Sequence, residues 1–411
     1  MKIKTLVLAL SIVGAASTAA WAQDSGMAQT AAVDADMYQA AIDNLNQISG
    51  RYDTGLTSNW VDYVTVHGGA YVDAAWGDQT QDTAGMNDNR TSVANSYLAI
   101  EATPNDWTKF DFAINYSDAS NSYQNAASTG SDNSNNSDDS SVYVDQAYAT
   151  IGNSNRYPLF LQAGQQYVPF GHYSLYPIVK SMGQVMSESN QTDFQAGFVL
   201  PKGLYGSVYT FQNSVSQNDS DNTPKFNYGA TVGFNKSNDR MNVDLGVGYI
   251  DNMVAITGVE NALITSTYST TVQGASAYVD FTTGPFGLQA DYVTAMDDFS
   301  ATDIRYKSGA GNLTDTARPS AGDITASYNF NKKGMDQQVF VGYQASSEAS
   351  GLDLPESRYL VGYNIYPWSN VLLGAEITRD TNYSSDYVYS DNDVAQGDDY
   401  YTYDLRVGVQ F

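Results

Sequence analysis

The residue types that most often perform catalysis are scarce in this chain. It contains no cysteine and two histidines, His67 and His172, among 411 residues. The lack of cysteine excludes disulfides, thiol catalysis and cysteine-ligated zinc. A Ser-His-acid site requires three side chains in one mutual geometry, and the surroundings of neither histidine suggest one. We therefore expect a protein that is not an enzyme and that uses no cofactor and no resident metal.

One segment places basic and titratable groups among apolar side chains. It runs from Gln165 to Thr192 and includes His172, Lys180 and several apolar residues that would be costly to expose to water. Pro169 and Gly171 interrupt the preceding strand pattern, so we expect the segment to fold back into the protein interior. The candidate ligand-binding or constriction residues are Tyr167, Pro169, Phe170, Gly171, His172, Lys180 and Gln184.

Two interpretations of this segment remain open. In the first, it narrows a channel, and its basic groups contact a carboxylate-bearing ligand. In the second, it packs against an inner wall and serves only stability. We favour the constriction. In an otherwise acidic channel, a basic group at the narrowest point of the channel would be the natural contact for a carboxylate-bearing ligand.

The rest of the chain has the period-two pattern of strands with one apolar and one polar face. The pattern is clearest in the last eleven residues, where the apolar positions are Tyr401, Tyr403, Leu405, Val407, Val409 and Phe411. This length suits a tilted strand that crosses a bilayer. The ending resembles the C-terminal strand of bacterial outer-membrane barrels, which typically stops at Phe and serves as an assembly signal.

About sixteen such segments follow one another from Val64 to Phe411, and short turns alternate with long polar loops between them. This alternation is typical of outer-membrane barrels, with turns in the periplasm and loops outside. An open edge in lipid would leave backbone groups unpaired, so the sheet must close. We predict an all-β, transmembrane antiparallel barrel of about 16 strands, wide enough to hold water. Counts of 14 to 18 are also compatible with the pattern.

The beginning of the chain predicts export. A basic start, a short apolar run and Ala20-Trp21-Ala22 indicate a signal peptide over residues 1–22. Residues 23–59 are expected to form a periplasmic segment, helical or disordered, in which Met37, Ala41, Leu45 and Ile48 recur at near-helical spacing. Residues 60–411 form the predicted barrel, and the expected location is the bacterial outer membrane.

The charge of the chain limits its partners. The formal net charge of −26 excludes a nucleic-acid partner. The expected partners are outer-membrane lipids and lipopolysaccharide, the barrel assembly machinery and a small solute. Acids outnumber bases on the polar faces of the strands, which would favour cations in a pore; ordinary solvation and ion pairing are the alternative. The candidate pore-lining residues are Asp73, Asp111, Asp244, Asp291, Asp323, Arg358, Glu376 and Arg406.

The Y-V-P-F-G run at Tyr167–Gly171 also carries a family resemblance. Together with Gly164-Gln165-Gln166, Lys180–Gln184 and Leu204–Tyr209, it resembles the LbtU-type siderophore porins, which are plug-less outer-membrane siderophore receptors. The resemblance covers essentially the whole chain. It implies a sixteen-strand barrel with a short periplasmic helical segment, and a role in iron uptake through passage of a ferric siderophore.

The chain departs from that pattern in one place. Relatives continue the loop as Leu-Gly-Glu, where this chain has Met182-Gly183-Gln184. Citrate-type siderophores are anionic, whereas the expected lumen is acidic. A general cation-preferring diffusion porin is therefore the alternative function.

Overall fold

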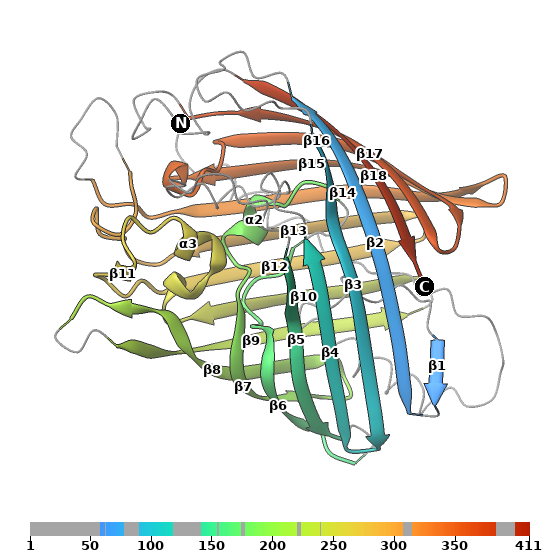
Figure 1. Cartoon of the computed structure of the whole chain (residues 1–411), viewed down its shortest axis with the longest axis horizontal. Helices are drawn as coiled ribbons and strands as arrows, with labels where there is room; N and C mark the ends of the chain where they lie inside the picture. Colours follow the sequence, from blue (N-terminus) through green and yellow to red (C-terminus); the bar gives the residue numbers. More distant parts are fainter. Residues whose placement is uncertain are drawn as a thin grey trace.

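The computed structural model describes residues 58–61, 63–77, 90–117, 141–153, 156–173, 177–219, 223–238, 240–306, 315–383 and 399–411. Sixteen strands form one closed antiparallel barrel (Figure 1). They are β2 (Val64–Gly77), β3 (Arg90–Asn105), β4 (Thr108–Ser117), β5 (Ser141–Gly152), β6 (Leu159–Tyr167), β7 (Asn190–Val199), β8 (Leu204–Gln217), β9 (Pro224–Asn238), β10 (Met241–Ile250), β12 (Gly274–Thr283), β13 (Phe286–Ala295), β14 (Ser320–Lys332), β15 (Met335–Ser347), β16 (Ser357–Trp368), β17 (Val371–Thr381) and β18 (Tyr400–Gln410).

The first and last barrel strands close the sheet. β18 pairs with β2 from Thr402↔Gly77 to Gln410↔Gly69. Beyond this ladder, the backbones of Phe411 and Gly68 exchange hydrogen bonds of 2.9 and 3.0 Å. Two short strands lie outside the sixteen: β1 (Ser58–Val61) pairs with the start of β2, and β11 (Thr267–Tyr268) pairs in parallel with β8.

The predicted strand count and antiparallel closure are confirmed. The predicted signal peptide and the helical or disordered segment over residues 23–59 lie almost entirely outside the described residues. In the described part of the chain, no helix is long and apolar enough to cross a membrane.

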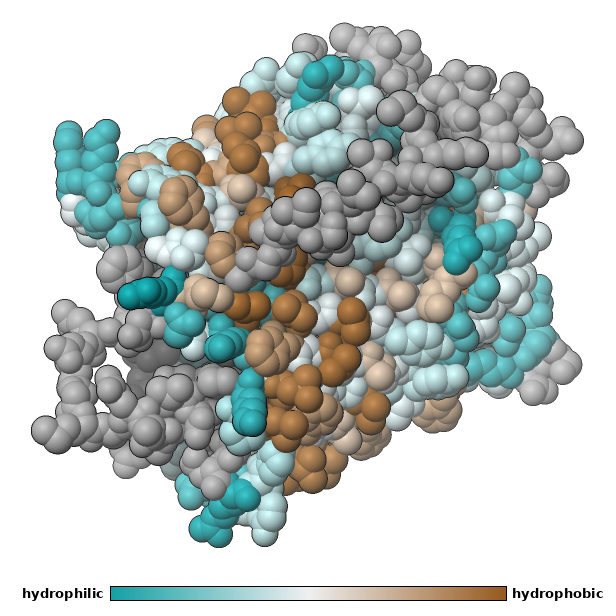
Figure 2. Space-filling view, turned by 180° about the vertical axis from the view of Figure 1, so that it is seen from behind, coloured by the Kyte–Doolittle hydropathy of each residue, from teal (hydrophilic) through white to brown (hydrophobic). Residues whose placement is uncertain are grey.

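The alternation of side chains separates an outer apolar face from an inner polar one. Outward residues such as Phe194 and Phe226 are 70% and 73% exposed, and apolar side chains gather in a belt between polar ends (Figure 2). Aromatic pairs lie near both ends of the strands, with Phe286 and Tyr328 near the short turns and Tyr343 near the long loops. Aromatic girdles of this kind mark the two interfaces of a membrane-spanning barrel.

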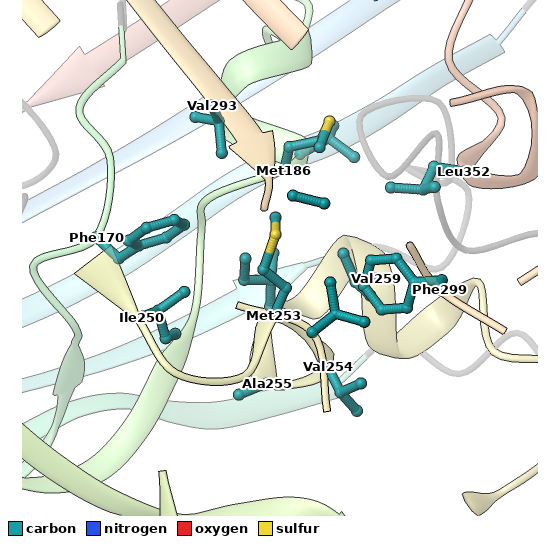
Figure 3. Packing of buried hydrophobic residues seen from close by; sticks show 14 of the residues in the cluster. Phe170, Met186, Ile250, Met253, Val254, Ala255, Val259, Val293, Phe299 and Leu352 are labelled. Atoms are coloured by element: carbon teal, nitrogen blue, oxygen red, sulfur yellow. The ribbon is translucent and has the colours of Figure 1, made fainter. Parts of the chain in front are cut away.

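An apolar core fills part of the long-loop end. Short helices from three loops contribute to it, namely α2 (Met182–Val185), η3 (Met253–Ala255) with α3 (Thr257–Asn261), and η4 (Ser350–Leu352). Phe170 and Met186 converge there with Met253, Val259 and Phe299 (Figure 3). The loops that contribute to this core therefore pack against one another.

Candidate functional site

The segment that the sequence singles out forms a loop inside the barrel. It comprises residues 168–189 between β6 and β7, described at 168–173 and 177–189, and we call it the inner loop. A hydrogen bond of 2.9 Å from Val168 N to Ser189 O closes its base. The loop contacts strands as far round the ring as β15, which stands opposite β6 in the strand order. This placement is consistent with the expectation that the segment folds back into the protein interior (Figure 1).

The first residues of the inner loop are structural. Tyr167 ends β6 and donates a hydrogen bond of 2.9 Å to Asp145. The Thr231 hydroxyl donates to the carbonyl of Pro169. Phe170 is 0% exposed within the apolar core. These candidate ligand contacts therefore lie in packing and turn positions.

Gly171 allows the inner loop to turn back on itself. Its φ of 84° lies in the left-handed region, and a Cβ there would come 2.3 Å from Cβ of Ser187. No L side chain fits such a position without a shift of the backbone. The Gly171 N–H donates to the Ser276 hydroxyl at 3.1 Å, which attaches the turn to β12.

His172 lies against the barrel wall. Its Nε2 is 2.5 Å from Oδ2 of Asp280, and its ring stacks on Tyr278 at 4.5 Å between centroids. Burial lowers the pKa of His172, but the charge and hydrogen bond of Asp280 and the charge of Asp244 outweigh it, so the net pKa is raised. His172 is thus paired with a carboxylate of β12, which favours the protonated form of its ring.

Lys180 is paired within the inner loop itself. Its Nζ is 2.7 Å from Oε1 of Glu188. Oε2 of the same carboxylate accepts hydrogen bonds from Tyr173 at 3.0 Å and from Gln184 at 2.6 Å. Glu188 therefore gathers three donors, and the charge of Lys180 is balanced locally.

The far end of the inner loop meets β16 and β17. Glu376 accepts backbone hydrogen bonds from Ile178 at 2.8 Å and from Val179 at 3.2 Å. Arg358 forms two hydrogen bonds of 2.7 Å with Asp380, and its Nη1 donates to the Lys180 carbonyl at 3.2 Å.

The returning arm of the inner loop carries α2. Ser181 caps this helix by accepting from Gln184 N at 3.1 Å. Gly183 N donates to Oδ2 of Asp323 at 2.9 Å. Asp323 and Asp291 are direct partners across β14 and β13, so two carboxylates face the start of α2.

Other predicted pore-lining residues lie on different parts of the wall. Arg406 on β18 binds Asp73 on β2 through hydrogen bonds of 2.8 and 2.7 Å. Oδ1 of Asp111 lies 3.3 Å from Nζ of Lys109, and both residues are on β4. Asp244 on β10 accepts from Tyr205 at 2.5 Å.

Three partners of the candidate residues were missed from the sequence. Asp280 shares the polar face of β12 with Tyr278 and Ser276, so the same alternation could have identified it. Asp380 lies four residues after Glu376 on β17, and therefore on the same face of the strand. No sequence pattern distinguishes Glu188, since its contacts arise only when the inner loop folds. Within the described residues, no group of three or more His, Asp or Glu side chains could hold a metal ion.

Comparison with known proteins adds distant homologues. No family model matches the chain. A UPF0422 protein of Coxiella burnetii is 28% identical over 252 residues, covering 60% of this chain and 53% of that protein. A UPF0422 protein of Legionella pneumophila strain Philadelphia 1 is 25% identical over 265 residues, covering 59% of this chain and 47% of that protein. The chain spans about half the length of the curated relatives it matches.

Solved structures with the same architecture are outer-membrane channels and porins. The channel DcaP of Acinetobacter baumannii has a TM-score of 0.53 at 14% identity, covering 85% of this chain and 97% of that one. An anion-selective porin from Comamonas acidovorans has a TM-score of 0.57 at 11% identity, covering 87% and 100%. This protein is a porin-like barrel of the bacterial outer membrane. At such low identity the likeness shows the fold alone.

Proposed function

We propose that the barrel is a water-filled channel that admits small solutes and prefers cations. The observation that carries this proposal is the inner loop, which lies within a sixteen-strand barrel and is attached to β9 and to β12 through β17. The passage would then lie toward β2–β5 and β18. A barrel of this size holds water, and a loop inside it narrows the opening.

The cation preference follows from the charges on that side of the lumen. Arg406 and Asp73 balance each other. Lys109 lies 2.9 Å from Glu101 and 3.3 Å from Asp111, so this cluster has one base for two acids. An acidic excess in a low-dielectric passage concentrates cations.

Reversal potentials across a planar bilayer in a salt gradient test the proposal. We expect current steps and a preference for K⁺ over Cl⁻ that weakens in high salt, because the Debye length falls from about 10 Å at 0.1 M to about 3 Å at 1 M. Selectivity for anions would contradict the proposed charge balance, and a lack of current steps would contradict the channel. The anion selectivity named for the Comamonas porin belongs to that protein.

A ferric siderophore is the more specific candidate solute, and it rests on the resemblance at Tyr167–Gly171. Tyr167 is buried and donates to Asp145 on β5, and Phe170 is buried in the apolar core, so this candidate depends on the channel as a whole. Titration of ferric siderophores into the bilayer chamber should block the current if they enter. Growth on a ferric siderophore should also weaken when the gene is deleted. A general porin would show neither effect.

The same proposal includes partners outside the lumen. Lipopolysaccharide would surround the aromatic girdle at the long-loop end, and the barrel assembly machinery would recognise the strand ending in Phe411.

A further inference from the structure

Glu376 lies on the lumenal face of β17, where strand alternation predicts a pore charge. It is 2% exposed. Its two carboxylate oxygens accept from successive backbone N–H groups of the inner loop, at 2.8 Å from Ile178 and at 3.2 Å from Val179. The carboxylate is therefore directed at the loop.

The wall beside Glu376 is shaped to receive the same part of the loop. Gly374 precedes Glu376 on the same face of β17, and a Cβ built there would lie 3.6 Å from Cδ1 of Ile178. Ile178 and Val179 are each 6% exposed. The side chain of Ile178 thus lies beside Gly374, while the neighbouring Glu376 carboxylate accepts the two backbone N–H groups.

Arg358 on β16 completes the attachment. Two of its nitrogens bind Asp380 at 2.7 Å, which fixes the guanidinium plane. The remaining Nη1 donates to the Lys180 carbonyl at 3.2 Å. The wall therefore holds residues 178–180 through their backbone, with an acceptor and a donor on neighbouring strands.

We propose that Glu376 and Arg358 are positioning residues that form a latch. The latch holds residues 178–180 against β16 and β17 and thereby sets the cross-section of the passage. Glu376 accordingly controls the width of the channel and does not contribute to its cation preference. The inference deepens the proposed function and rests on it for the meaning of the passage.

A single cysteine can report on the latch, because the chain has none of its own. Val179→Cys places a thiol at the latched position and leaves Ile178 in its contact with Gly374. We expect a membrane-impermeant maleimide to label it about tenfold faster or more when Glu376→Ala removes both hydrogen bonds. Glu376→Gln retains one acceptor oxygen and should give an intermediate rate. Arg358→Ala should also accelerate labelling.

Glu101→Gln is the matched control. It removes the same charge from the lumenal wall, beside Lys109, and should leave the labelling rate unchanged. Heat-modifiable migration on gels confirms that each variant has formed a barrel. Gly374→Val offers a second route. Its Cβ would lie 3.6 Å from Cδ1 of Ile178 and 2.9 Å from Oδ1 of Asn364, so the added methyl groups would press on both side chains while Glu376 stays in place, and labelling should accelerate again.

Bilayer recordings separate width from charge. Glu376→Gln should increase conductance and current fluctuation with an unchanged reversal potential, whereas Glu101→Gln should shift the reversal potential. Equal labelling in Glu376→Ala and the parent would overturn the latch. A shifted reversal potential in Glu376→Gln with unchanged labelling would also overturn it. Labelling needs no current, so failure of the latch is distinguishable from failure of the channel.

Discussion

Gly183→Ala tests the fit between the inner loop and the wall. A Cβ at Gly183 would lie 1.8 Å from Oδ2 of Asp291 and 2.6 Å from Oδ2 of Asp323. These carboxylates stand on the paired ladder of β13 and β14, so we expect α2 to move instead of the strands. Such overpacking costs about 1–3 kcal/mol. Loss of the bond from Gly183 N to Asp323 adds about 1.5–3 kcal/mol. We expect about 4 kcal/mol in total, or a factor of roughly several hundred in the docked-to-released ratio of the loop.

The assay combines single-channel recording with labelling of Val179→Cys in the Gly183→Ala background. Both conductance fluctuation and labelling should rise, while heat-modifiable migration stays normal because the strand ladders are untouched. Adding Asp291→Ala removes the nearest obstructing atom and should restore much of the parent behaviour. Unchanged fluctuation and labelling in Gly183→Ala would refute the close approach of α2 to the wall.

Three further predictions follow from single positions. The pKa of His172 is raised by Asp280. The pair therefore stabilises the fold fully below about pH 6.5, and this contribution is lost as the pH rises through the raised pKa. In urea unfolding, the loss of stability caused by His172→Gln should accordingly become smaller at alkaline pH. Phe170→Ala should lower the unfolding free energy by about 3–5 kcal/mol in the same assay, since it empties a fully buried site. Deleting Phe411 removes its two backbone bonds to Gly68 and should reduce the heat-modifiable fraction in outer membranes; normal assembly would contradict its role as a signal.

The barrel could be predicted closely because lipid enforces the pattern. Every spanning strand must pair on both sides and present an apolar outer face, so few competing arrangements exist. The sequence placed the strand from Val64 at its true beginning. Strand bounds are harder to predict at the long-loop end, where β8 continues to Gln217. There the strands leave the membrane, and the apolar alternation that reveals them is no longer required.

The candidate site was predicted only in part, because alternation identifies a face and not a partner. Strand alternation places Glu376 and Arg358 on the polar face, and both side chains are buried in the folded protein. It cannot show that Glu376 meets Ile178, which is separated from it by 198 residues. His172 and Lys180 were proposed as ligand contacts on charge alone, and in the folded protein each lies beside a carboxylate. Their role in ligand binding stays a prediction.

The pairing of an apolar loop with an acidic wall has a physical logic. An irregular loop has backbone N–H groups without partners in regular structure, and burial makes unpaired groups costly. Wall carboxylates are costly to bury for the same reason unless donors reach them. Glu376 and Asp323 meet the donors of Val179 and Gly183, while the apolar side chains of the loop join the core at the other side. Part of the acidic excess on the strands therefore serves to hold the loop, and a count of lumenal acids overstates the charge that a passing ion encounters.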